Sequence, residues 1–130
     1  MTPELSYLAW TALLTAVLWI PYIVGQVVTN GFLSGENYRD PTPRPVPDWA
    51  KRANRAHLNA VETFAPFAAL VWIIHVTNGA SEMTALWAAI FFWARVGHAV
   101  VYWLGVPYLR TLIFAAGNVA ILGLFYEAVT

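Results

Sequence analysis

The segment from about Leu5 to Val28 contains no charged residue at all. As a helix rising about 1.5 Å per residue, it would exceed the roughly 30 Å of hydrocarbon in a bilayer. A cleaved signal peptide is the alternative, but it would need a basic start and a shorter apolar core, whereas the nearby charge here is Glu4. The segment therefore predicts a first transmembrane helix at about 5–28.

Three more apolar segments follow, and they predict helices at about 49–76, 83–104 and 108–129. Charged residues make up 11% of the chain, against about 25% in soluble proteins. We therefore predict an all-α fold in which residues 1–130 form one integral membrane domain. Short connections would make successive helices antiparallel, which gives an up-down four-helix bundle.

Prolines and turn residues mark the expected boundaries. Pro21 should kink the first helix, which membrane helices tolerate. Asp48 is expected to be the N-cap of the second helix, and residues 78–80 should form a tight turn. The loop at 29–47 is expected to be extended because it contains Pro41, Pro43, Pro45 and Pro47.

Basic residues predict the orientation. They flank the first-to-second and third-to-fourth connections, which lie on one side of the membrane, and the opposite side has none. By the positive-inside rule, that side is cytoplasmic and both termini lie on the other side. The residues that carry this bias are Arg39, Arg44, Lys51, Arg52, Arg55 and Arg110.

Polar residues also occur where the helices should enter the bilayer. The apolar part of the second helix, at 64–76, is too short to span, so part of the segment 52–62 must lie at or below the interface. Helical spacing places these residues on shared faces and predicts that Lys51 and His57 point elsewhere. The second helix contributes Arg52, Arg55, Asn59 and Glu62, the third Arg95, His98 and Tyr102, and the fourth Arg110 and Thr111.

Charges at this depth cost several kcal/mol unless they face the bundle or water. One interpretation is a set of salt bridges between helices, such as Glu62 with Arg95. However, the four arginines at this depth outnumber the one acid, Glu62. A buried excess of positive charge implies that an anion is missing. Arginine suits carboxylates, and the single acid suits an ammonium group, so the pattern favours a ligand that carries both.

Other functional classes have less support. His57, His75 and His98 are scattered, and the chain has no cysteine, so we expect no metal site. The net charge of zero gives no reason to expect nucleic acid. A channel or transporter would usually show internal repeats and broken helices near the midplane, and none is evident.

Two motifs resemble a known family. The string RANRAHLNAVETFAPF at 52–67 is similar to the signature of the membrane-associated proteins in eicosanoid and glutathione metabolism (MAPEG), with Arg55, Asn59, Glu62 and Pro66 at the family's spacing. The string ARVGHAVVY at 94–102 resembles the microsomal prostaglandin E synthase and microsomal glutathione transferase branch. Pro107 followed by Arg110 and Thr111 resembles that branch's next element, with one extra residue.

The resemblance implies a homotrimer that binds glutathione between subunits, near the cytoplasmic side. It implies that Arg55 and Arg95 hold carboxylates, that Asn59 bonds the tripeptide backbone and that Glu62 takes the ammonium group. Arg52 and His98 would complete the glutathione site. Tyr102, Arg110 and Thr111 would be catalytic, with Arg110 stabilising the thiolate.

The leading hypothesis is a glutathione-dependent membrane transferase or peroxidase that acts on apolar electrophiles or lipid peroxides, in detoxification. The alternatives are a non-catalytic membrane protein of the same fold that binds a lipid or an anionic thiol, and a purely structural subunit. The sequence departs from the prostaglandin branch in the first helix, where Gln26, Thr29 and Asn30 replace a basic residue, and Asp40 and Asp48 are both candidates for its loop aspartate.

Overall fold

A computed structural model describes residues 1–32, 39–40, 42 and 44–130. Its helices are α1 (Pro3–Val17), α2 (Trp19–Asn30), α4 (Asp48–Val76), α5 (Glu82–Leu104) and α6 (Leu109–Val129). Pro41, Pro43 and residues 33–38 of the predicted loop lie outside the described residues. Among the described residues, and with α1 and α2 counted as one span, four helices are long and apolar enough to cross a membrane. The predicted all-α, four-span fold is therefore confirmed.

The first span is interrupted at Leu18, between α1 and α2. Pro21 lacks the backbone N–H that would bond to the carbonyl of Val17, and its ring crowds that carbonyl. The break thus lies one turn before the proline. Thr2 begins α1 as an N-cap, because its side chain accepts a hydrogen bond from the backbone of Leu5 at 3.3 Å.

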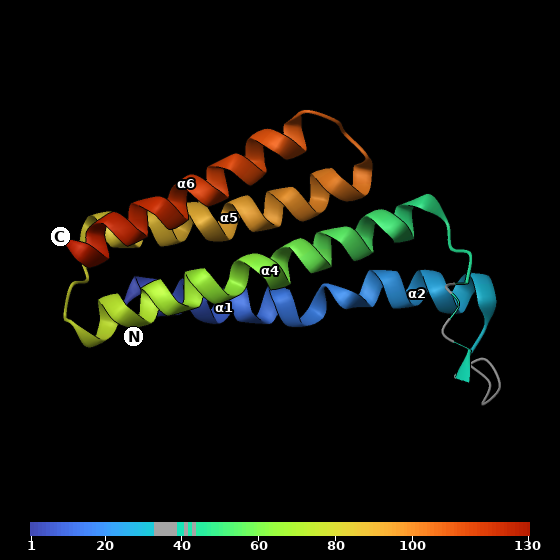
Figure 1. Cartoon of the computed structure of the whole chain (residues 1–130), viewed down its shortest axis with the longest axis horizontal. Coiled ribbons are helices and arrows are strands. Elements are labelled where there is room, and N and C mark those ends of the chain that lie inside the picture. Colours follow the sequence, from blue (N-terminus) through green and yellow to red (C-terminus); the bar gives the residue numbers. More distant parts are fainter. Residues whose placement is uncertain (33–38, 41, 43) are drawn as a thin grey trace.

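The helices run up and down, as Figure 1 shows, and both termini lie at one end of the bundle. α5 packs against α6, α1 and α4, whereas α2 packs mainly on α4. The turn after α4 contains Asn78 with φ of 55°, a conformation that asparagine tolerates. Because the helices alternate in direction, the end of the bundle opposite the termini holds the start of α4, the end of α5 and the start of α6 (Figure 1).

The start of α4 differs from the expectation. Pro47 occupies the N-cap position, and no side chain caps the helix. The prediction that Asp48 is the N-cap was wrong by one residue, because the fixed φ of Pro47 and its extended backbone suit the residue before the first turn. Asp48 is instead in the first turn, where its charge complements the positive end of the helix dipole.

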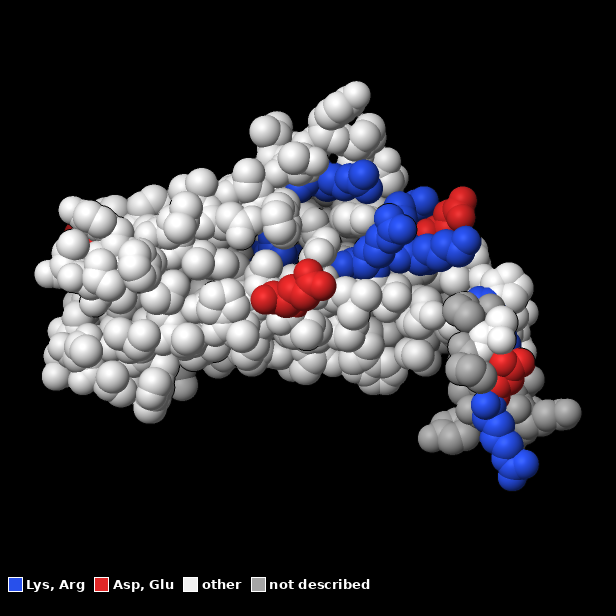
Figure 2. Space-filling model, in the orientation of Figure 1, with Lys and Arg blue, Asp and Glu red and all other residues white. Residues whose placement is uncertain are grey.

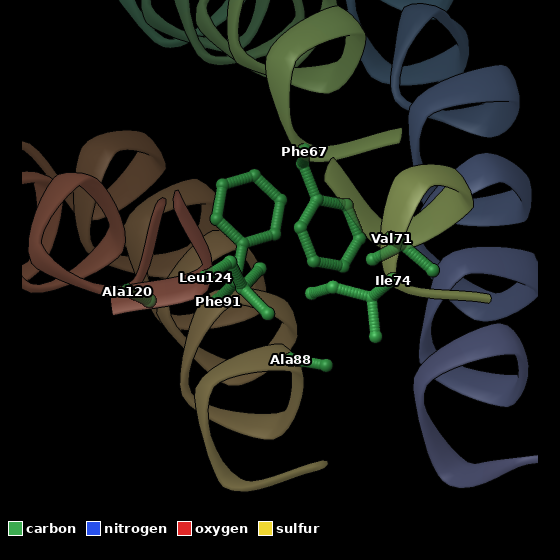
Figure 3. Packing of buried hydrophobic residues seen from close by; sticks show 7 residues of the cluster. All are labelled: Phe67, Val71, Ile74, Ala88, Phe91, Ala120 and Leu124. Carbon is green, nitrogen blue, oxygen red and sulfur yellow. The ribbon is translucent and has the colours of Figure 1, made fainter. Parts of the chain in front are cut away.

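The two halves of the bundle have different cores. Near the termini, large side chains fill the space between α4, α5 and α6, and the rings of Phe67 and Phe91 stack with centroids 4.1 Å apart. Toward the other end the buried cluster contains mainly small residues, including Ala56, Ala60 and Ala99. The first cluster, shown in Figure 3, comprises Phe67, Val71, Ile74, Ala88, Phe91, Ala120 and Leu124. Small side chains leave room beside them for polar groups.

Close helix contacts hold α5 against α6 and α1. A Cβ added at Gly123 would lie 2.3 Å from Cε2 of Trp87, so only glycine lets these helices approach there. At the same end of the bundle, Ser81 and Thr84 form a capping box that begins α5. The hydroxyl of Thr84 also donates to the buried carboxylate of Glu4, which ties α1 to α5.

Candidate functional site

Basic side chains gather toward the end of the bundle that lies opposite the termini (Figure 2). The first two turns of α4 supply Lys51, Arg52 and Arg55, and the first turn of α6 supplies Arg110. The expectation that Lys51 points away from the arginines was wrong, because Lys51 lines the same cavity as Arg52 and Arg55. Lys51 lies four residues before Arg55, and that spacing puts both on one face of a helix.

The first cavity is open and has a volume of about 210 Å³. It lies between the start of α4, the end of α5 and the start of α6. Four of its side chains are basic and one is acidic, so it carries a cationic excess. The lining residues are Asp48, Lys51, Arg52, Arg55, Tyr102 and Arg110.

Arg52 is held in place by the end of α5. Its Nε donates to the backbone carbonyl of Trp103 at 3.2 Å, and a cation is favourable beside the last carbonyls of a helix. Gly105 follows α5 with φ of 71°, and a Cβ there would lie 3.4 Å from Cζ of Arg52. Glycine is suited to this position because it adopts the left-handed backbone conformation without strain and because it has no Cβ to hinder the guanidinium of Arg52.

Arg110 and Tyr102 form a contact pair in this cavity. The guanidinium carbon of Arg110 lies 4.9 Å from the ring centroid of Tyr102, a cation–π distance. Tyr102 is buried, and Arg110 is half-buried. Tyr108 leads into α6 with φ of 63° and ψ of −51°, which is strained for a residue with a side chain. This strained turn at Tyr108 precedes Arg110 by two residues and helps to place its guanidinium over the ring of Tyr102.

A second open cavity of about 240 Å³ adjoins the first and shares Tyr102 and Arg110 with it. The ring of His98 lies 5.3 Å from that of Tyr102 and 5.9 Å from that of Phe114, centroid to centroid. This cavity is therefore more aromatic and carries one cation. Its lining residues are Asn59, His98, Tyr102, Arg110, Thr111 and Phe114.

Arg95 lies in the interior of the bundle and lines neither cavity. It is 3% exposed, and its guanidinium carbon lies 5.7 Å from the ring centroid of Phe91 and 5.4 Å from that of Phe114. Its Nη1 donates to the hydroxyl of Thr63 at 3.4 Å, while its Nε has no partner. Arg95 thus lines neither cavity, although its guanidinium lies near Phe114, which lines the second.

Glu62 is exposed on α4 and lines neither cavity. Among the described residues, the hydrogen bond of Arg95 goes to Thr63 and not to Glu62. Asp40, the other candidate loop aspartate, is also outside both cavities. It is exposed, and the backbone N–H of Thr42 donates to it at 2.9 Å, which holds the pKa of Asp40 below its ordinary value.

The structure brings together seven of the nine residues predicted for the site, in two adjoining cavities. Sequence reasoning left out Lys51 and Phe114 as lining residues and named Asp48 only as an N-cap and a candidate loop aspartate. Helical spacing could have found two of them, since Lys51 precedes Arg55 by four residues and Phe114 follows Arg110 by four. In the described part of the chain, no three histidine or acidic residues lie close enough to hold a metal ion.

The comparisons with known proteins agree with the sequence motifs. A search of curated proteins found none that matches this chain. The sequence profile of the MAPEG family matches residues 6–130, which include all four spans except the first residues of α1. This match covers both cavities and every residue of the candidate site, so we conclude that the chain belongs to the MAPEG family.

Proposed function

We propose that this integral, multi-pass membrane protein is a glutathione-dependent transferase or peroxidase. It would activate the glutathione thiolate against apolar electrophiles or lipid peroxides. The observation that carries the proposal is the pair of adjoining cavities that share Tyr102 and Arg110. One is rich in cations and suits a charged peptide, and the other contains Phe114 and suits an apolar molecule.

The charged cavity matches the chemistry of the tripeptide. Glutathione carries two carboxylates, one ammonium group and a thiol. Arg52 and Arg55 would hold carboxylates through charge-assisted hydrogen bonds, since the fork of a guanidinium fits a carboxylate. Arg110 lies where the two cavities meet, so a thiol beside it would face the second cavity. Its positive charge would lower the thiol pKa from a free value of about 8.5.

The second cavity would receive the electrophile. Phe114 and His98 offer aromatic faces, and Thr111 offers a hydroxyl that can donate a hydrogen bond to a leaving group or a peroxide oxygen. The reacting atoms would meet at Arg110 and Tyr102, which both cavities share. A fixed cation at that point stabilises charge that is present on the attacking thiolate.

Assembly as a homotrimer, with the active site toward the cytoplasm, completes the proposal. Glu62 is exposed in the isolated subunit, although a charge at membrane depth costs several kcal/mol unless protein or water covers it. A neighbouring subunit would supply that cover. The resemblance to trimeric family members and the basic bias of one end support this arrangement.

Conjugation of glutathione to a chlorinated aromatic compound, in detergent, tests the proposal. The parent protein should show turnover that saturates with glutathione, and Arg110→Ala should lose most of it. Arg110→Lys is the matched control, because it keeps a positive charge at the same position and should retain part of the turnover. A parent that gains thermal stability with glutathione but shows no turnover, with either the chlorinated compound or a lipid hydroperoxide, would identify the non-catalytic binding protein instead.

A further inference from the structure

We propose that Asn30 is a positioning residue, which orients the first turns of α4 and so places Arg52 and Arg55 for glutathione. The inference rests on the proposed function. It goes beyond that function because Asn30 lines neither cavity and is on a different helix from both arginines. Asn30 is the last residue of α2, and it acts through a hydrogen bond to the chain that leads into α4.

A row of polar side chains follows one face of α2 at every fourth position, and we call Tyr22, Gln26 and Asn30 the α2 polar row. The amide of Gln26 donates to the hydroxyl of Tyr22 at 2.7 Å, and the amide of Asn30 donates to the side-chain carbonyl of Gln26 at 3.3 Å. All three side chains are half-buried. The row therefore orients the Asn30 side chain, because one of its two amide hydrogens is bonded within the helix.

The second amide hydrogen of Asn30 makes a bond outside the helix. Its Nδ2 donates to the backbone carbonyl of Pro45 at 2.8 Å. Two residues later, Pro47 is the N-cap of α4, with φ of −63° and ψ of 157°. Because proline restricts φ at both 45 and 47, little backbone freedom remains between the bonded carbonyl and the first turn of α4. The bond from Asn30 thus limits the direction in which α4 begins.

Close packing of α2 on the first turn of α4 supports the same role. A Cβ added at Gly25 would lie 2.6 Å from Cβ of Ala50 and 3.2 Å from Cη2 of Trp49, so the two helices approach closely there. Among the described helices, α2 packs on α4 and slightly on α1, but not on α5 or α6. The influence of α2 therefore falls on the start of α4, and Arg110 on α6 lies outside it.

A simpler role for the α2 polar row is local, since side chains four residues apart stabilise the helix that carries them. Loss of that role would lower the stability of the whole protein without separating KM from kcat. Loss of positioning would raise KM for glutathione, because Arg52 and Arg55 would hold groups that stay charged throughout the reaction. It would leave kcat and the thiol pKa nearly unchanged, because these depend on Arg110.

The experiment measures steady-state kinetics, the pKa of the bound thiol and the melting temperature, in detergent, with glutathione and a chlorinated aromatic compound. Asn30→Leu keeps the size of the side chain and removes its donors, Asn30→Gln keeps an amide, and Thr29→Val is the control at the neighbouring exposed position. Asn30→Leu should raise KM for glutathione roughly 2- to 10-fold, the range for loss of one hydrogen bond. Asn30→Gln should recover part of that loss, and Thr29→Val should match the parent.

Hydrogen exchange of the backbone amides tests the positioning without any ligand. In Asn30→Leu, exchange should become faster in the first two turns of α4 and stay unchanged in the first two turns of α6. Equal acceleration in both helices, or a lower melting temperature with KM and kcat unchanged, would reduce Asn30 to the local role and overturn the inference.

The outcomes separate this inference from the proposed function. If the parent binds glutathione without turnover, the same variants are compared by Kd. An unchanged KM or Kd in Asn30→Leu would overturn the inference while glutathione binding by the parent stands. A parent that neither binds glutathione nor turns it over would overturn the proposed function, and the inference with it, because Arg52 and Arg55 would then hold no tripeptide.

Discussion

Removal of the Arg110 guanidinium is the change whose effect follows most directly from the geometry. Arg110 lies over Tyr102 where the two cavities meet, so a thiolate that faces the second cavity would have this cation beside it. A unit charge about 4 Å away contributes about 1 kcal/mol in bulk water and about 4 kcal/mol at the effective dielectric constant of a protein surface. Because the cavity is open and Arg110 is half-buried, we expect an intermediate value of about 1–3 kcal/mol.

That energy predicts the size of both observable effects. One pKa unit corresponds to about 1.4 kcal/mol, so Arg110→Ala should raise the pKa of the bound thiol by about 1–2 units. At neutral pH the thiolate fraction falls accordingly, and kcat should decrease roughly 10- to 100-fold. Arg55→Ala removes a contact to a group that is charged before, during and after the reaction, so it should raise KM and leave kcat nearly unchanged.

The assay is a pH titration of ultraviolet thiolate absorbance for glutathione complexes of the parent, Arg110→Ala, Arg110→Lys and Arg55→Ala, alongside steady-state kinetics. Arg110→Lys keeps the charge and should recover part of the pKa shift. An Arg110→Ala protein with weaker glutathione binding but an unchanged thiol pKa and kcat would refute the reasoning. Arg110 would then hold a carboxylate, and the thiolate would need another stabiliser.

Three further predictions concern topology, assembly and stability. The chain has no cysteine, so single cysteines at Thr42 and Thr130 should label from opposite sides of sealed vesicles, and labelling from one side only would contradict the four-span topology. Chemical cross-linking in mild detergent should stop at a trimer, whereas a clean monomer that still binds glutathione would exclude a site that needs a neighbouring subunit. Gly123→Ala should destabilise the fold by about 1–3 kcal/mol through its contact with Trp87 and lower the melting temperature, while Gly97→Ala, whose Cβ would make ordinary contacts at 3.7 Å, should not.

The helices were predictable because each apolar segment has to cross the same thickness of hydrocarbon. The second span was predicted at about 49–76, and α4 runs from Asp48 to Val76. The proline effects were less predictable in their details. Pro21 acts through the carbonyl one turn earlier, so the break lies at Leu18, and Pro47 displaced Asp48 from the N-cap position.

The sequence predicted most of the residues that line the two cavities, but it did not predict how those residues are arranged in space. Helical spacing shows which residues share a face, and it grouped Arg52, Arg55 and Glu62. Helical spacing does not show which part of that face of α4 is covered by the neighbouring helices α5 and α6. Arg52 and Arg55 line the first cavity, Asn59 lines the second, and the exposed Glu62 lines neither. Arg95 faces the interior of the bundle, where its guanidinium lies near the rings of Phe91 and Phe114 and donates to Thr63.

A structure of the protein reconstituted with saturating glutathione tests the central claim most directly. We predict density for the tripeptide in the cavity lined by Arg52, Arg55 and Tyr102, with its sulfur beside Arg110. Density for the sulfur away from Arg110, or a cavity that remains empty at saturating glutathione, would contradict the account.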